Sequence, residues 1–171
     1  MARRIEELIR NLDLREHPEG GFYRRTYRSP HMLPAQCLPQ GFHGPRPLGS
    51  AIVYLLKSRQ VSALHRIKSD ELWHFYEGSP LTIYMIDEDG AKIERKLGAD
   101  TDRRESFQVL VPAGCWFGAL VNRPDSYSLV GCTVFPAFDF QDFELGDRGT
   151  LITLFPQHRT LIELLTHDPT S

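Results

Sequence analysis

The chain is poor in cysteine, and its cysteines show no spacing that predicts a metal site or a disulfide framework. Its 171 residues include only Cys37, Cys115 and Cys132, an odd number without a C-x-x-C pair. A disulfide scaffold or a zinc knuckle is therefore not expected, and we expect the protein to reside in the reducing cytoplasm.

An excess of charge of one sign is also missing. The 20 Lys and Arg residues stand against 22 Asp and Glu, for a formal net charge of −2, so we expect neither nucleic acid nor an anionic membrane as a partner. No apolar run has the length of a membrane-spanning helix, and the first residues lack the apolar core of a secretory signal. With 41% hydrophobic residues, the sequence predicts one globular domain over residues 1–171, with its core in 8–166.

Helical periodicity is confined to the two ends of the chain. It predicts an amphipathic helix over residues 3–12 and a closing helix after Pro156, whereas five prolines and three glycines predict a long loop over residues 29–49. Alternating or short apolar runs predict strands at 22–28, 51–56, 61–67, 71–76, 81–86, 91–97, 107–111, 116–121 and 127–134. Many short strands without βαβ alternation predict an all-β antiparallel sandwich or barrel.

The stretch SALHRIKSDELWHFYEG, from Ser62 to Gly78, is the first candidate for a functional site. We predict a hairpin with its turn at residues 68–70, and strand parity then aims His65 and Glu71 at the same interior space. A buried imidazole and a buried carboxyl group are unfavourable unless they are paired or used.

These residues resemble the first motif of the cupin superfamily, HxHxxxExxxxxxG, with Ile67 at the second His position. The later stretch PAGCWF is similar to the second motif, PxGxxH, with Phe117 in place of the His. The chain as a whole resembles an uncharacterised branch of single-domain cupins, the cupin-5 type, on the segments 17–22, 69–74 and 139–143. The resemblance implies a cupin double-stranded β-helix, a jelly-roll-like antiparallel β-sandwich or barrel with short terminal helices.

In metal-binding cupins the two motifs supply a four-ligand cage, of which only His65 and Glu71 remain here. We therefore expect no tightly bound metal cofactor, because two ligands do not hold a zinc or iron ion. A weakly held divalent ion at His65 and Glu71 is the remaining option, and a metal-dependent cupin enzyme is the weakest of the functions considered.

The resemblance leaves two main functions open. One is a cupin that binds a small molecule inside its barrel. The other is an isomerase or epimerase acting on a sugar or sugar nucleotide, with His65 as general base beside Glu71 and with Tyr23 or Tyr127 as the partner acid. The structural alternative is a buried His65–Glu71 pair that only satisfies its own hydrogen bonds.

Other side chains are candidate ligand contacts because they share the inward parity or stand in polar loops: Trp73, Phe117, Arg25, His17, Glu19, Lys68 and Asp139. Trp73 and Phe117 form either an aromatic wall or plain core. The guanidinium of Arg25 suits an anionic or sugar-like group, with an exposed strand face as the alternative. His17 and Glu19 lie in a loop that forms either a pocket rim or an ordinary turn. A solvated surface position is the alternative for Lys68 and Asp139.

The resemblance also implies a homo-oligomer, most simply a homodimer. Small cupins commonly pair through sheet edges or exchanged terminal strands, and the apolar end helices and the loop of residues 29–49 offer such surfaces.

Overall fold

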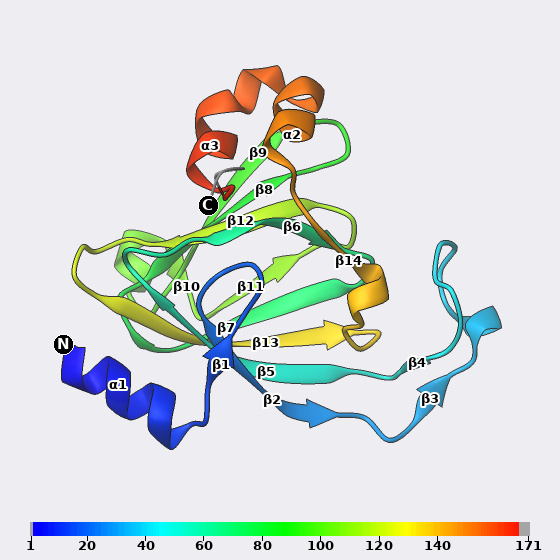
Figure 1. The fold of residues 1–171 in the computed structure, drawn as a ribbon, viewed down its shortest axis with the longest axis horizontal. Coiled ribbons are helices and arrows are strands. Elements are labelled where there is room, and N and C mark those ends of the chain that lie inside the picture. The colour runs from blue at the N-terminus through cyan, green and yellow to red at the C-terminus, as the bar shows by residue number, and fades with distance from the viewer. Residues whose placement is uncertain (1, 168–171) are drawn as a thin grey trace.

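The computed structural model, which describes residues 2–167, shows two six-stranded β-sheets packed face to face (Figure 1). The first sheet contains, in spatial order, β1 (Arg15–Glu16), β2 (Phe22–Arg28), β5 (Ser50–Lys57), β13 (Tyr127–Phe135), β7 (Asp70–Gly78) and β11 (Gln108–Val111). The second contains β10 (Glu105–Ser106), β9 (Lys92–Leu97), β8 (Leu81–Ile86), β12 (Trp116–Val121), β6 (Ser62–Ile67) and β14 (Phe143–Leu145). All neighbours are antiparallel except β10 and β9. The predicted jelly-roll-like antiparallel β-sandwich with short terminal helices is confirmed.

The inner faces of the two sheets bury the main core. Its fully buried members come from both sheets and include Leu56, Trp73, Val130, Ile83, Phe117 and Ala119. Each such large apolar side chain contributes about 1.5–3 kcal/mol when it is removed from water. The alternation of these residues with polar ones therefore determines which face of each strand points inward.

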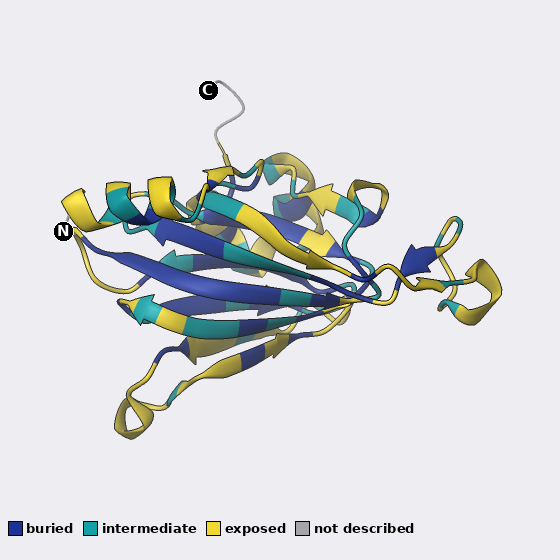
Figure 2. Cartoon of the chain, turned by 90° about the horizontal axis from the view of Figure 1, so that it is seen from below, coloured by how far each residue is buried: buried dark blue, intermediate teal, exposed yellow. Residues whose placement is uncertain are grey.

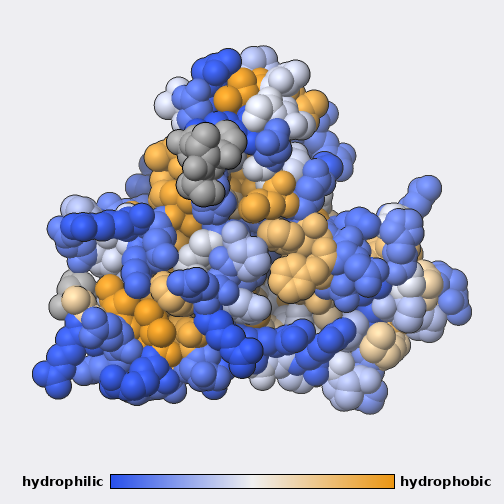
Figure 3. Space-filling model, viewed as in Figure 1, coloured by the Kyte–Doolittle hydropathy of each residue, from blue (hydrophilic) through white to orange (hydrophobic). Residues whose placement is uncertain are grey.

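Helices cover the outer faces of the sandwich. Helix α1 (Ala2–Asn11) packs through Leu8 against Leu55 and Leu129 of the first sheet. Helices α2 (Arg148–Leu154) and α3 (Arg159–Leu164) cover the outer face of the second sheet. Figure 3 shows apolar side chains beside α1 and below α2 and α3, with polar side chains around them. None of the described helices combines the length and the apolar character that crossing a bilayer requires.

In the described part of the chain, short 3₁₀ helices lie in the connections: η1 (Ala35–Cys37), η2 (Thr101–Arg103), η3 (Phe140–Asp142) and η4 (Pro156–His158). Residues 29–49, predicted as a long loop, also carry the two-stranded pair β3 (Met32–Leu33) and β4 (Arg46–Pro47). They form an arm that projects from the sandwich and is mostly exposed (Figure 2). Arg46 fixes the base of the arm, because its guanidinium donates two hydrogen bonds to the buried carboxylate of Asp142, at 2.7 and 3.0 Å.

The predicted hairpin of residues 61–76 is wrong. Strand β6 pairs with β12 and β14, whereas β7 pairs with β13 and β11, so the two strands lie in opposite sheets. Lys68 and Ser69 carry the chain from one sheet to the other. The inward parity of His65 and Glu71 is nevertheless retained, because the inner faces of the sheets oppose each other. Apolar residues that recur at every second position specify which face of a strand is buried, but they do not specify which other strand pairs with it.

Candidate functional site

A cavity of about 50 Å³ lies between the two sheets, and we call it the chamber. Six of its lining side chains are imidazoles, carboxyl groups or phenols: His17, Glu19, Tyr23, Tyr54, His65 and Glu71. The others are mostly apolar: Ser50, Ile52, Ile67, Cys132, Val134 and Phe138. A volume of this size exceeds what a single water molecule requires, so the chamber admits a small chemical group.

The loop between β1 and β2 delivers His17 and Glu19 to the chamber. Gly20 has φ +108°, and a Cβ at this position would lie 2.2 Å from the carbonyl oxygen of Val61, so only glycine fits. The loop is fixed further by Ala63 N, which donates to the carbonyl oxygen of Glu19 at 2.8 Å. This close approach of the loop to β6 turns the Glu19 side chain into the sandwich.

Glu19 is the centre of a buried hydrogen-bond network. Its Oε2 lies 3.1 Å from His65 Nε2 and 3.5 Å from His17 Nδ1. Its Oε1 accepts a hydrogen bond from Ser62 Oγ at 2.9 Å. The carboxyl group therefore joins the N-terminal loop to strand β6.

The contacts of His65 define where its protons lie. Nδ1 is 2.8 Å from the carbonyl oxygen of Ala63, which can only accept, so Nδ1 carries a hydrogen. Nε2 and Glu19 Oε2 then share one proton. Burial lowers the pKa of His65 to about 4 and raises the pKa of Glu19, so both effects favour the uncharged pair, in which Glu19 donates to the imidazole.

Glu71 enters the same chamber from the opposite sheet. Burial, reinforced by the nearby Glu19, raises the pKa of Glu71 to about 8. Burial also lowers the pKa of His17. At neutral pH His17 and His65 are thus uncharged, burial shifts Glu19 toward its uncharged form, and Glu71 is mostly protonated and can donate a hydrogen bond.

A second hollow of about 250 Å³, which we call the vestibule, adjoins the chamber. The two share Tyr23, Ile52 and Phe138 as lining residues, so the vestibule lies directly beside the chamber. Its further lining comes from β2 and the segment before η3: Arg25, Arg28, Asp139 and Phe140.

The structure brings most of the predicted site residues to these two hollows. His65, Glu71, Tyr23, His17 and Glu19 line the chamber, and Arg25 and Asp139 line the vestibule. The aromatic pair predicted as wall or core lies behind the chamber: Trp73 and Phe117 are 1% and 0% exposed and belong to the main core. The ring of Phe117 supports the imidazole of His65, at 4.0 Å between centroids.

Tyr127 lies away from the chamber, on the outer side of the first sheet. Its hydroxyl donates a hydrogen bond to Glu77, whose carboxylate also binds Arg4 of α1 at 2.8 and 2.9 Å. The ring of Tyr127 belongs to the same buried apolar cluster as Leu8 of α1 and Leu129 of β13. The structure thus places Tyr127 in a contact between helix and sheet.

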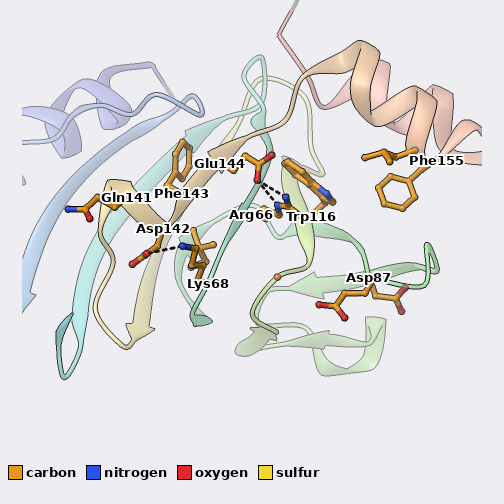
Figure 4. A pocket seen from close by; sticks show the side chains of 13 residues that line it. Arg66, Lys68, Asp87, Trp116, Gln141, Asp142, Phe143, Glu144 and Phe155 are labelled. Atoms are coloured by element: carbon orange, nitrogen blue, oxygen red, sulfur yellow. Dashed lines mark hydrogen bonds and ion pairs between the residues drawn. The ribbon is translucent and has the colours of Figure 1, made fainter. Parts of the chain in front are cut away.

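Lys68 lines a different hollow, a groove of about 670 Å³ on the outer side of the second sheet (Figure 4). Its Nζ lies 2.7 Å from the carbonyl oxygen of Gly41 and 3.6 Å from Asp142. Arg66, in the same groove, binds Glu144 at 2.7 Å (Figure 4). Although this groove is larger than the chamber, several of its charges are already paired with one another. We therefore regard the chamber and the vestibule as the candidate site.

Sequence reasoning missed four polar residues of the site: Ser50, Tyr54 and Arg28 among the lining residues, and Ser62 beside Glu19. Tyr54 donates to the carbonyl oxygen of Gly20 at 2.8 Å and so helps to hold the loop of Glu19. Its alternation with Ile52 and Leu56 was a signal for an inward side chain. Within residues 2–167, no three His, Cys, Asp or Glu side chains are arranged to hold a metal ion. A weakly held ion at His65 and Glu71 stays a prediction.

Comparison with known proteins gives a family match over most of the chain. Residues 6–146 match the family Cupin_5, described as Cupin superfamily (DUF985). The uncharacterized protein YML079W of Saccharomyces cerevisiae is 25% identical over 146 residues, which cover 81% of this chain and 73% of that protein.

Two solved structures are similar over nearly their whole length. Protein SO0799 from Shewanella oneidensis is 41% identical with a TM-score of 0.84, covering 95% of this chain and 96% of that one. A hypothetical protein from Leishmania major is 34% identical with a TM-score of 0.85, covering 95% and 98%. Oxalate decarboxylase from Bacillus subtilis, 14% identical with a TM-score of 0.54, shares the fold alone, and this chain covers 37% of it.

Proposed function

We propose that this chain, which belongs to the Cupin_5 family (DUF985) of the cupin superfamily, binds a small molecule in the chamber between its two sheets, without a tightly bound metal. The observation that carries the proposal is the convergence of His17, Glu19, His65 and Glu71 on one cavity. Burying so many ionisable groups is unfavourable for folding, and a ligand that hydrogen-bonds to them gives them a use. Mouths and interiors of β-barrels are also preferred ligand sites.

The protonation states indicate which kind of group enters the chamber. Burial raises the pKa of Glu71 to about 8, so this carboxyl is a hydrogen-bond donor at neutral pH. Burial favours the uncharged form of the Glu19–His65 pair as well. An uncharged, oxygen-bearing group such as a carbonyl or a hydroxyl therefore fits the chamber better than an ion does.

A second candidate is an isomerase or epimerase acting on a sugar or related carbonyl compound. The distance of 3.1 Å between Glu19 Oε2 and His65 Nε2 favours this second candidate. A carboxyl group and an imidazole that share a proton can together accept a proton from a carbon acid. Tyr23 lines the same chamber and can serve as the partner acid. However, both nitrogens of His65 are engaged, so His65 reaches a substrate only when Glu19 turns away. We therefore place binding first.

We also propose a cytoplasmic homodimer. The thiols of Cys37, Cys115 and Cys132 are all free, which supports a reducing compartment. Large apolar side chains on the outer face of the first sheet support pairing of two copies.

A thermal-shift screen tests the proposal. Keto acids, sugar phosphates and sugar nucleotides are offered to the wild type, and a compound that binds the folded state raises the melting temperature. We expect this shift to be lost in Glu71→Leu, which keeps the side-chain volume but removes the donor, and kept in Glu144→Leu of the outer groove. A shift that is equal in all three proteins would place the ligand outside the chamber.

The same compounds separate the two candidate functions. An isomerase or epimerase exchanges a carbon-bound hydrogen of its substrate, and in heavy water this exchange appears as deuterium incorporation in proton NMR spectra. A compound that binds without exchange supports the binding protein. A compound whose exchange disappears in Glu19→Gln supports the enzyme.

A further inference from the structure

Two arginine side chains stand at the vestibule without a partner in the protein. Arg25 and Arg28 of β2 line it and both are exposed, and within residues 2–167 the side chain of neither forms a hydrogen bond or an ion pair. Arg24, between Tyr23 and Arg25 on the same strand, has the opposite parity and does not line either hollow. Strand β2 thus places two free guanidinium groups in the vestibule, next to Tyr23, which lines both the vestibule and the chamber.

The remaining lining gives the vestibule a net positive charge. Among the described residues that line it, Asp139 is the acidic one, and its Oδ1 accepts a hydrogen bond from Gln141 N at 3.0 Å at the start of η3. Phe138 and Phe140 form apolar walls, with their rings 5.0 Å apart. Apolar walls reduce the local dielectric screening and strengthen the attraction of an anion to the arginines.

We propose that Arg25 and Arg28 bind the anionic group, a carboxylate or a phosphate, of the same molecule whose uncharged end enters the chamber. This inference rests on the function proposed above and names its ligand class: a small hydroxy or keto compound that carries one anionic group. Guanidinium forks match the geometry of carboxylate and phosphate oxygens.

The dimensions and the charges of the two hollows require this orientation. The chamber, at about 50 Å³, holds only a few non-hydrogen atoms, whereas the vestibule offers about 250 Å³. Because both are lined by Tyr23, Ile52 and Phe138, the two hollows are adjacent, and we infer that one molecule occupies both. An anion inside the chamber would meet Glu19 and Glu71 without a cation beside it, so the charged end stays with the arginines.

Calorimetric titration with matched probes tests the inference. Dihydroxyacetone phosphate carries both ends, dihydroxyacetone carries the neutral end only, and inorganic phosphate carries the anion only; pyruvate replaces the phosphate by a carboxylate. We expect dihydroxyacetone phosphate or pyruvate to bind more tightly than either half. The double variant Arg25→Gln/Arg28→Gln weakens that binding about tenfold or more and leaves dihydroxyacetone unchanged. Arg24→Gln is the matched control and binds all probes like the wild type.

The outcomes separate this inference from the proposed function. If dihydroxyacetone binds through Glu71 and the double arginine variant binds every anionic probe like the wild type, the anion site is wrong and the chamber still binds a ligand. If dihydroxyacetone phosphate loses affinity in the arginine variant but not in Glu71→Leu, the ligand does not span both hollows, and the inference is overturned. Absence of binding by both dihydroxyacetone phosphate and pyruvate also overturns it.

Discussion

Glu19 Oε2 lies 3.1 Å from His65 Nε2, while His65 Nδ1 lies 2.8 Å from the carbonyl oxygen of Ala63. The imidazole is therefore held at both nitrogens, with its hydrogen on Nδ1 and its Nε2 turned to a carboxyl group. Burial favours the uncharged form of both partners. Burial by the fold therefore shifts the pKa values of the ionisable groups in the chamber. The first two predictions concern two of these groups, Glu19 and Glu71.

Glu19→Ala should lower the free energy of unfolding by about 2–4 kcal/mol, because it leaves a cavity and removes the partner of His65 and Ser62. Glu19→Gln is the control. Its amide can donate to His65 Nε2 and accept from Ser62 Oγ, so its stability should stay within about 1 kcal/mol of the wild type. Urea denaturation of the three proteins measures both changes, and an alanine variant as stable as the wild type would show that Glu19 does not hold this network.

The raised pKa of Glu71 predicts a pH dependence of stability. In the unfolded chain this carboxyl has the ordinary pKa of 4.5, and in the folded protein about 8, so between these values the folded state binds more protons. Its contribution to stability is complete below pH 4.5 and is lost as the pH rises through about 8. The melting temperature of the wild type should thus fall relative to that of Glu71→Gln as the pH rises from about 5 to about 9.

Scanning calorimetry at a series of pH values measures this difference. The glutamine variant imitates the protonated carboxyl and cannot ionise, so every other titrating group is common to the two proteins. Parallel curves for wild type and Glu71→Gln would mean that Glu71 is charged in the folded state.

Gly20 should not tolerate a side chain. It has φ +108°, and a Cβ would lie 2.2 Å from the carbonyl oxygen of Val61, so Gly20→Ala should destabilise the protein by about 3 kcal/mol or more and displace Glu19. Gly41, in the projecting arm, has φ +101° but nothing within 4 Å of its Cβ position. Gly41→Ala therefore measures the backbone strain alone, about 1 kcal/mol. Equal melting temperatures of the two variants would contradict the close packing of this loop.

The outer face of the first sheet predicts the surface of the proposed dimer. Tyr76, Leu110 and Phe135 are each more than half exposed on its strands, an exposure that a second copy would remove. Light scattering should give twice the chain mass of 19.6 kDa, and Leu110→Lys should shift it toward the monomer. Leu154→Lys, at 58% exposure in the outer groove, is the control. A wild-type mass of one chain would refute the dimer.

Much of the fold follows from the spacing of apolar residues. The strands expected at 22–28 and 116–121 have those bounds in the structure, because each is bordered by turn residues. The partners of β6 and β7, which lie in opposite sheets, could not be predicted in this way, since alternation says nothing about the neighbouring strand. Tyr127 has odd parity on β13, where Val130, Cys132 and Val134 face the main core, and it is buried on the other side of the sheet under α1. Because both sides of this strand are covered, the sequence did not indicate which side faces the chamber.

The loop part of the site was less accessible from the sequence. His17 and Glu19 were candidates because of the surrounding Pro and Gly residues, but their meeting with His65 depends on where the loop crosses β6. That crossing is set by the contact of Gly20 with the backbone at Val61, more than 40 residues away in the sequence. Arg28, at the end of β2, follows a register shift after Arg25, which hid its direction.

The nitrogen-15 chemical shift of His65 Nε2 tests most directly whether the chamber binds a small molecule. It is recorded with and without the compound that stabilises the protein most, and His158, whose Nε2 lies 2.8 Å from the carbonyl oxygen of Gly90 outside the chamber, serves as the reference. We predict that the His65 signal moves on saturation while that of His158 stays in place. An unchanged His65 signal in the saturated protein would contradict a ligand site between the two sheets.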